Sequence, residues 1–114
     1  MQMTLEEADG QVTRIILAGR MDLEGTQAID QSFAFATSTQ PRRIAVDMSR
    51  VTFLASIGIR ALLIAARAQA GRGGKFVLCN PDPMVRKVIV TAGIDQVIPV
   101  FDDFSGACDA LRAA

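Results

Sequence analysis

Ser56 stands at the start of the most regular helical pattern in the chain, and its hydroxyl is the leading candidate for chemistry. Arg60 and Arg67 follow on the same side, because about 100° per residue brings both guanidiniums near the Ser56 direction. Gly58 leaves room beside the hydroxyl for a partner backbone. Helix starts offer free N–H groups and a partial positive charge that suit phosphate. The spacing therefore favours a phosphoacceptor serine, with an ordinary helix N-cap as the alternative.

The sequence lacks the residues that other common kinds of catalytic and metal site require. The chain contains no His, Tyr or Trp, which removes Ser-His and Cys-His nucleophile pairs and His-based zinc sites. The two cysteines, Cys79 and Cys108, lack the spacing of a metal or redox pair. Asp22 and Glu24 have no third carboxylate beside them to complete a metal site. We therefore expect no enzyme activity, no cofactor and no metal.

The charge is balanced overall but not along the chain. Twelve basic side chains match twelve acidic ones, so net charge indicates neither a nucleic acid nor a membrane surface as partner. Residues 40–90, however, carry nine basic and two acidic side chains, a net charge of +7. This segment either forms solvated helix faces or meets something anionic. A small nucleotide-binding protein is one alternative, although residues 72–75 (RGGK) lack the frame of a phosphate loop.

No segment resembles a signal peptide, and the most apolar run, residues 53–66, is short of the roughly 20 residues that span a bilayer. We expect a cytoplasmic protein without membrane insertion and with reduced thiols.

Apolar periodicity predicts the elements that must position Ser56. Strands are expected at residues 1–6, 12–18, 44–47, 75–79 and 97–100, and helices at residues 26–37, 59–70, 83–92 and 104–111. Asp9-Gly10 predicts a tight hairpin, and residues 19–25 a loop. Gly71 is expected to end the second helix, and Asp82, Gly93 and Asp103 to cap helices.

This order predicts an α/β fold in a single domain spanning residues 1–114. An N-terminal antiparallel hairpin followed by parallel crossovers gives a mixed sheet of four to five strands. Right-handed crossovers place consecutive helices mainly on one face of that sheet.

Residues 46–59 (VDMSRVTFLASIGI) resemble the characteristic segment of STAS domains, specifically the bacterial anti-sigma factor antagonists. In that family a strand ending in Asp-hydrophobic-Ser leads to a Phe-hydrophobic-Asp-Ser-Ser-Gly-hydrophobic segment. Residues 19–22 (GRMD) are similar to the loop after the family's second strand, and residues 83–94 to its third helix and the Gly-Leu beyond it. The order and spacing of these motifs cover nearly the whole chain.

The resemblance implies a regulatory binding protein. Ser56 falls on the serine that a cognate anti-sigma factor kinase phosphorylates, Gly58 on the family glycine, and Asp22 on the loop aspartate near that serine. The expected partner-binding surface comprises Met21, Asp22, Ser56, Ile57, Gly58 and Arg60. The expected partners are an anti-sigma factor serine kinase and a PP2C-type serine phosphatase, with no direct binding of nucleic acid.

Two positions depart from the family pattern. Ala55 replaces the usual Asp, which removes a charge that would repel a phosphate but also a possible partner contact. Ile57 replaces the usual second hydroxyl, and either exposes an apolar group to a partner or is buried under the first helical turn. These departures support the alternative of a non-switching STAS scaffold, a subunit of a lipid-transport or stress-sensing complex.

Overall fold

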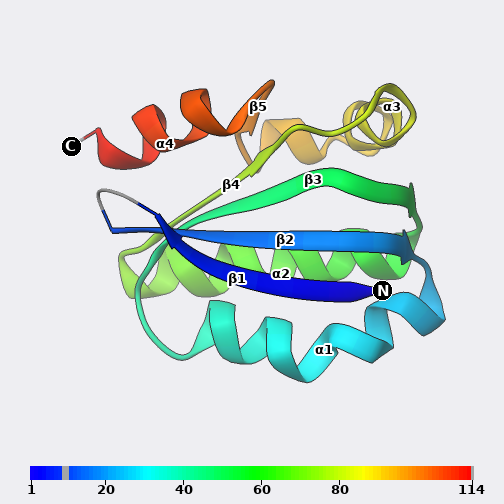
Figure 1. Cartoon of the computed structure of the whole chain (residues 1–114), viewed down its shortest axis with the longest axis horizontal. Coiled ribbons are helices and arrows are strands. Elements are labelled where there is room, and N and C mark those ends of the chain that lie inside the picture. Colours follow the sequence, from blue (N-terminus) through cyan, green and yellow to red (C-terminus); the bar gives the residue numbers. More distant parts are fainter. Residues whose placement is uncertain (9–10, 114) are drawn as a thin grey trace.

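Five strands form one mixed sheet, in the spatial order β1-β2-β3-β4-β5, in the computed structural model of the chain (Figure 1). The structure describes residues 1–8 and 11–113, so the predicted Asp9-Gly10 turn lies outside the described residues. The strands are β1 (Gln2–Ala8), β2 (Val12–Met21), β3 (Arg43–Leu54), β4 (Lys75–Cys79) and β5 (Val100–Phe101). β1 and β2 are antiparallel and the other pairs are parallel, which confirms the predicted topology.

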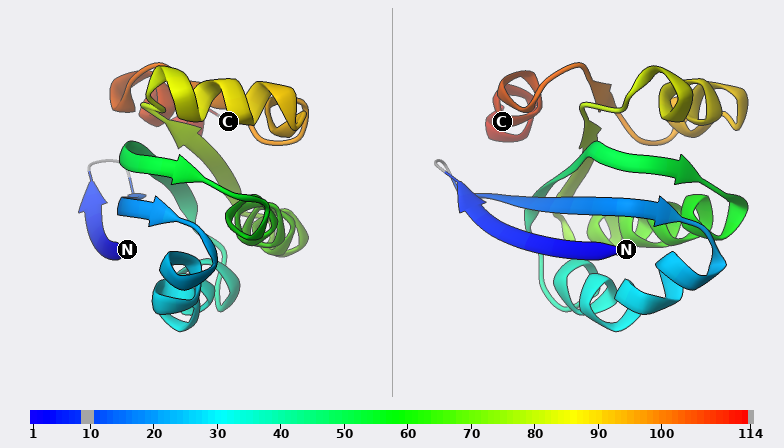
Figure 2. Two further views of the ribbon diagram at one scale, coloured as in Figure 1. Left: turned by 90° about the vertical axis from the view of Figure 1, so that its right-hand side faces the viewer. Right: turned by 45° about the vertical axis from the view of Figure 1, so that its right-hand side comes forward.

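Four helices connect and cover the strands: α1 (Leu23–Ser38), α2 (Ser56–Arg72), α3 (Pro83–Thr91) and α4 (Phe104–Arg112). The larger core joins one face of the sheet to apolar residues of α1, α2 and α3. A smaller core on the opposite face holds Val12, Ala45 and Val77 against Ala107, Cys108 and Leu111 of α4. The prediction that the helices lie mainly on one face is therefore confirmed, and the composition of the two cores makes α4 the exception. Figure 2 shows α1 and α2 side by side, with α4 on the other side of the strands from them.

Strand and helix ends differ from the predicted ones for identifiable reasons. β2 continues through the expected loop to Met21, and α1 starts early, at Leu23, because Asp22 caps it. β3 continues to Leu54, since beyond Asp47 it still pairs with β2. α2 runs one residue past Gly71, and Gly73 ends it in the left-handed region at φ +81°.

The predicted fifth strand is present, but its predicted position at residues 97–100 is wrong. A short 3-10 helix, η1 (Ile94–Gln96), comes first, and β5 begins only at Val100. The chain takes this path because it buries Ile94 and Ile98 in the larger core while leaving Val97 exposed. The predicted left-handed Gly93 and the Asp caps of α3 and α4 are confirmed.

Candidate functional site

Ser56 is the first residue of α2 and is exposed. The N-cap is Ala55, which has no side-chain acceptor, so the alternative that Ser56 is itself the cap is excluded. Each of the other three helices is capped by an aspartate that accepts from the third helical N–H: Asp22 from Gly25, Asp82 from Val85 and Asp103 from Gly106. Among α1 to α4, only the start of α2 therefore lacks a side-chain partner for its free N–H groups.

Two contacts attach this helix start to the end of β2. The Ala55 N–H donates to the Met21 carbonyl at 3.1 Å. A Cβ on Gly58 would lie 2.6 Å from Met21 Cγ and 3.0 Å from both Leu54 Cδ1 and the Met21 carbonyl oxygen. Only glycine fits here, because α2 crosses directly over the β2 end.

These contacts correct two expectations. The space beside Gly58 is filled by Met21 of the same chain and is not open to a partner backbone. Met21, expected on the partner-binding surface, is fully buried, and Gly58, expected on the same surface, is also buried. Both residues therefore position the Ser56 turn and present no surface for a partner to contact.

Asp22 caps α1, and each of its carboxylate oxygens accepts a hydrogen bond from its own chain. Its Oδ1 accepts from the Gly25 N–H at 2.8 Å and its Oδ2 from Arg20 Nε at 3.3 Å. The backbone hydrogen bond from Gly25, together with the bond and charge of Arg20, holds the pKa of the Asp22 carboxyl below its usual value. The carboxylate is thus ionised at neutral pH and fixes the chain between β2 and α1.

Arg20 and Phe53 form a surface pair that the sequence pattern does not predict. They are register partners on β2 and β3, and the Arg20 guanidinium lies 4.2 Å from the centre of the Phe53 ring. Phe53 is 41% exposed. A cation–aromatic pair of this kind, which reaches Asp22 through Arg20, is well suited to contact a protein partner. Nothing in the sequence marks it, because the pairing depends on a register shift between Gly19 and Arg20.

Ile57 and Arg60 line a shallow hollow of about 280 Å³ between α1 and α2. The α1 side supplies Thr26, Gln27 and Asp30, and the α2 side adds Ala61 and Ile64. Ile57 is half-buried, which is intermediate between exposure to a partner and burial under the first helical turn. Arg60 and Arg67 are exposed on α2. Neither arginine forms an ion pair with any residue that the structure describes.

Asp47, part of the same sequence motif, has a structural role. Its Oδ2 accepts from Arg14 Nη2 at 2.5 Å and its Oδ1 from the Ser49 N–H at 3.0 Å. Burial by itself raises the pKa of Asp47, but these hydrogen bonds outweigh it and hold the pKa below its usual value. Arg14 also lies over the Phe104 ring at 4.3 Å, so the pair ties β2 and β3 to α4.

The two cysteines are free and buried in the smaller core. Burial raises the pKa of Cys79 to about 12 and also raises that of Cys108. Both therefore remain protonated at neutral pH and are poor nucleophiles.

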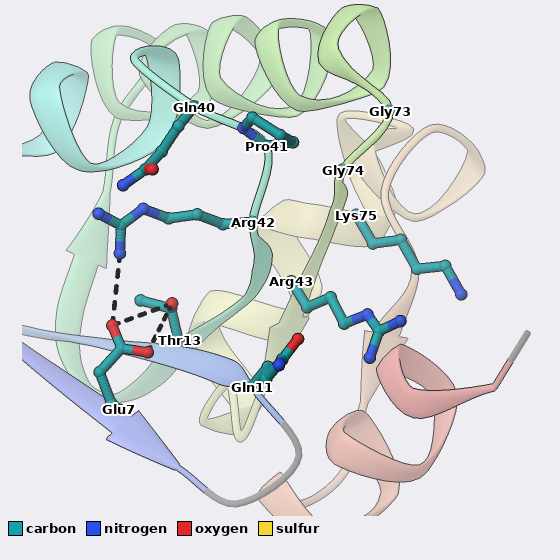
Figure 3. A pocket seen from close by; sticks show the side chains of 10 residues that line it. All are labelled: Glu7, Gln11, Thr13, Gln40, Pro41, Arg42, Arg43, Gly73, Gly74 and Lys75. Carbon is teal, nitrogen blue, oxygen red and sulfur yellow. Dashed lines mark hydrogen bonds and ion pairs between the residues drawn. The ribbon is translucent and has the colours of Figure 1, made fainter.

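A second hollow, of about 380 Å³, lies at the other end of the sheet, where β3 and β4 begin (Figure 3). Two of its three cations have partners: Arg42 Nη1 lies 3.3 Å from Glu7 Oε1, and Lys75 Nζ donates to the Ala113 carbonyl, while Arg43 has no ion pair among the described residues. Buried Gln69 holds the wall, accepting from the Arg42 N–H and donating to the Thr37 and Gln40 carbonyls. We assign this hollow to the architecture of the fold and not to the Ser56 site.

Within the described residues, no group of three His, Cys, Asp or Glu side chains could hold a metal ion. None of the helices in that part of the chain is long and apolar enough to cross a membrane.

The fold and the position of the Ser56 turn are those of a known class of protein domain. The family model described as "Mlab, STAS domain" matches residues 4–100. The chain therefore belongs to the STAS domain family, as the motifs predicted.

Relatives within this family are named as anti-sigma factor antagonists. BtrV of Bordetella bronchiseptica, which bears the name of an anti-sigma factor antagonist, is 26% identical over 114 residues, covering 100% of this chain and 97% of BtrV. The crystal structure of an anti-sigma factor antagonist from Mycobacterium paratuberculosis superposes with a TM-score of 0.88 at 25% identity, covering 98% and 94% of the two chains.

The unphosphorylated form of the anti-sigma factor antagonist SpoIIAA gives a TM-score of 0.76 at 24% identity, covering 97% of this chain and 96% of SpoIIAA. A structure of phosphorylated SpoIIAA from Bacillus gives 0.69 at 23% identity, covering 97% and 100%. These likenesses establish the fold.

Proposed function

We propose that this protein is an anti-sigma factor antagonist that binds a kinase-type anti-sigma factor and is released when that kinase phosphorylates Ser56. The observation that carries the proposal is the exposed Ser56 hydroxyl at the one long helix start, among α1 to α4, that has no side-chain cap. Relatives named as anti-sigma factor antagonists support the partner class.

The proposed binding surface is built around the start of α2. Ser56 lies at its centre, and Ile57 and Arg60 extend it into the hollow between the helices. The proposed surface also includes the Arg20–Phe53 pair, which lies near the ends of the two strands that lead to α1 and α2. An apolar side chain of the partner fits against Ile57, and a carboxylate of the partner against Arg60. Asp22 fixes the α1 start and contributes its outer edge.

The proposed switch is a phosphoryl transfer. The Ser56 oxygen attacks the terminal phosphorus of ATP bound to the partner, ADP leaves, and the hydroxyl proton passes to a base of the partner. ATP and magnesium belong to the kinase, and this chain supplies only the acceptor oxygen. A PP2C-type phosphatase restores the serine by hydrolysis.

A phosphate on Ser56 is compatible with the folded free protein but disrupts the complex with the partner. The N–H groups at the start of α2 and the unpaired Arg60 guanidinium provide donors and positive charge on the same helix face. At a protein interface, however, the phosphate adds roughly two negative charges that must be desolvated. The complex is therefore lost while the free protein stays folded.

Binding measurements with charge variants test the surface. We expect Ser56→Asp to weaken binding to the purified anti-sigma factor at least about tenfold, and the neutral isostere Ser56→Asn to weaken it less. Ser105→Asp, which adds the same charge at an exposed position of α4, serves as the matched control and should bind like wild type. Equal affinities for Ser56→Asp and Ser56→Asn would show that charge at this position does not matter.

A second candidate is the non-switching STAS scaffold, which Ala55 and half-buried Ile57 favour. It predicts that a pull-down recovers a transporter ATPase in place of a kinase. It also predicts that Ser56→Asp and Ser56→Asn behave alike, because the residue would then act only through packing.

A further inference from the structure

The sheet has one long open edge. β1 pairs only with β2, through an unbroken register from Gln2↔Ala18 to Ala8↔Val12. No backbone hydrogen bond from another described segment reaches its outer side. The opposite edge, β5, is only two residues long. A long, regular edge strand presents a row of free N–H and C=O groups that can pair with another strand.

This edge lacks most of the usual devices against pairing. The β1 sequence, QMTLEEA, contains no Pro and no Lys, and its register carries no bulge. Each of its two carboxylates is paired with an arginine of the same chain. Glu6 lies 3.8 Å from Arg14, while Glu7 pairs with Arg42 at 3.3 Å and accepts from the Thr13 hydroxyl at 3.2 Å (Figure 3). The carboxylates therefore offer little repulsion to an approaching strand.

An apolar groove runs beside the same edge. Met3 and Leu5 of β1 face α1, where Phe35 and Ala36 complete a hollow of about 470 Å³ that Gln31, Ser32 and Arg42 border. Phe35 is 68% exposed and Leu5 is 41% exposed. Large apolar side chains clustered along an open strand favour covering by another strand.

We propose that a second copy of this chain covers the edge, with the two β1 strands antiparallel and Thr4 facing Thr4 across a two-fold axis. In this register Met3 lies opposite Leu5, so apolar side chains meet on the α1 face. Gln2 lies opposite Glu6, so an amide meets a carboxylate on the other face. No glutamate faces a glutamate, and the two grooves beside Phe35 join into one.

Neighbouring registers fit less well. Only shifts of two residues keep both α1 helices on the same face of the joined sheet, because side chains alternate along a strand. One such shift places the Glu7 carboxylate opposite Met3, and the other leaves only Gln2–Thr4 of β1 in the ladder. The Thr4-centred register thus pairs the longest stretch without setting a charge against an apolar side chain. Ser56 does not line this groove, so the dimer leaves the proposed partner surface free.

Cysteine cross-linking tests the register directly. Directly opposed residues of antiparallel strands have Cα atoms about 4.5–5.5 Å apart, within the range of a disulfide. Thr4→Cys should therefore form a disulfide-linked dimer under mild oxidation. Gln2→Cys and Glu6→Cys should each remain largely uncross-linked alone but cross-link when mixed, because each faces the other. Native Cys79 and Cys108 are buried and do not compete.

Light scattering on the full chain tests the dimer without cysteines. Wild type should be dimeric, and Leu5→Lys should raise the dimer dissociation constant at least about tenfold by placing a cation in the shared groove. Val97→Lys, at a similarly exposed apolar position away from β1, should leave the dimer intact. Circular dichroism verifies that both variants fold. A monomeric wild type, or Thr4→Cys cross-linking no better than Gln2→Cys alone, would overturn the proposal.

Discussion

Gly58 sets how closely the Ser56 turn approaches the sheet. Any Cβ at this position meets both a flexible atom, Met21 Cγ, and a rigid one, the Met21 carbonyl oxygen. The sequence motif identified Gly58, but the requirement for glycine comes from a contact within the chain and not from a partner. This contact depends on β2 continuing to Met21, where a loop was predicted.

Replacing this glycine should therefore destabilise the protein. We expect Gly58→Ala to lower the free energy of unfolding by about 1–3 kcal/mol through overpacking. Gly71→Ala is the control, because nothing lies within 4 Å of a Cβ at this position of the same helix. It should be neutral or raise stability by up to about 1 kcal/mol. Urea unfolding measures both, and equal effects would refute the close approach of α2 to β2.

The Asp47–Arg14 pair gives a pH dependence with a defined sign. Because the pKa of folded Asp47 lies below its usual value of 3.8, the stabilisation is present above that value. It is lost as the pH falls through the folded-state pKa. We expect the stability of wild type to fall between about pH 5 and about pH 3 more steeply than that of Asp47→Asn. Urea unfolding across this range tests it. Asp95→Asn, an exposed control, should follow wild type.

At the scale of elements, the four helix starts show how much of the site was predictable. Asp82 and Asp103 were identified as caps from sequence because an N-capping aspartate acts within one turn of its own helix. The start of α2 was placed correctly near Ser56, yet its lack of a cap became clear only from the backbone geometry of Ala55.

The missing cap can be restored. An aspartate at position 55 would accept from the Gly58 N–H, as the other three caps do at their third helical residue. We expect Ala55→Asp to raise the free energy of unfolding by about 1 kcal/mol, and Ala55→Leu not to raise it. Thermal unfolding measures both. No gain from the aspartate would mean that the N–H groups of this turn are already satisfied.

Strand length was harder to predict than strand existence. Residues 44–47 are an apolar run because this part of β3 lies between β2 and β4. Beyond Asp47 the strand pairs with β2 alone, and Ser49, Arg50, Thr52 and Phe53 are exposed. The apolar pattern therefore ends long before the strand does. The Arg20–Phe53 pair was missed for the same reason, since it lies in the unpredicted ends of both strands.

At the scale of the whole molecule, the structure shows where the basic side chains of residues 40–90 lie and which of them have partners. Three of these cations have partners in the chain: Arg42 pairs with Glu7, Lys75 donates to the Ala113 carbonyl, and Arg86 pairs with Asp102. Arg60 and Arg67 are exposed on the same helix as Ser56, without an ion pair in the described part of the chain. The positive charge of this segment is therefore partly engaged within the chain and partly exposed on α2.

The central claim is that Ser56 accepts a phosphoryl group from a partner and thereby loses that partner. Intact-mass measurement after incubation with a purified anti-sigma factor kinase and magnesium ATP tests it most directly. We predict that wild type gains the mass of one phosphate, that Ser56→Ala gains none, and that the modified protein no longer co-elutes with the kinase. An unmodified wild type, or equal modification of Ser56→Ala, would contradict the account.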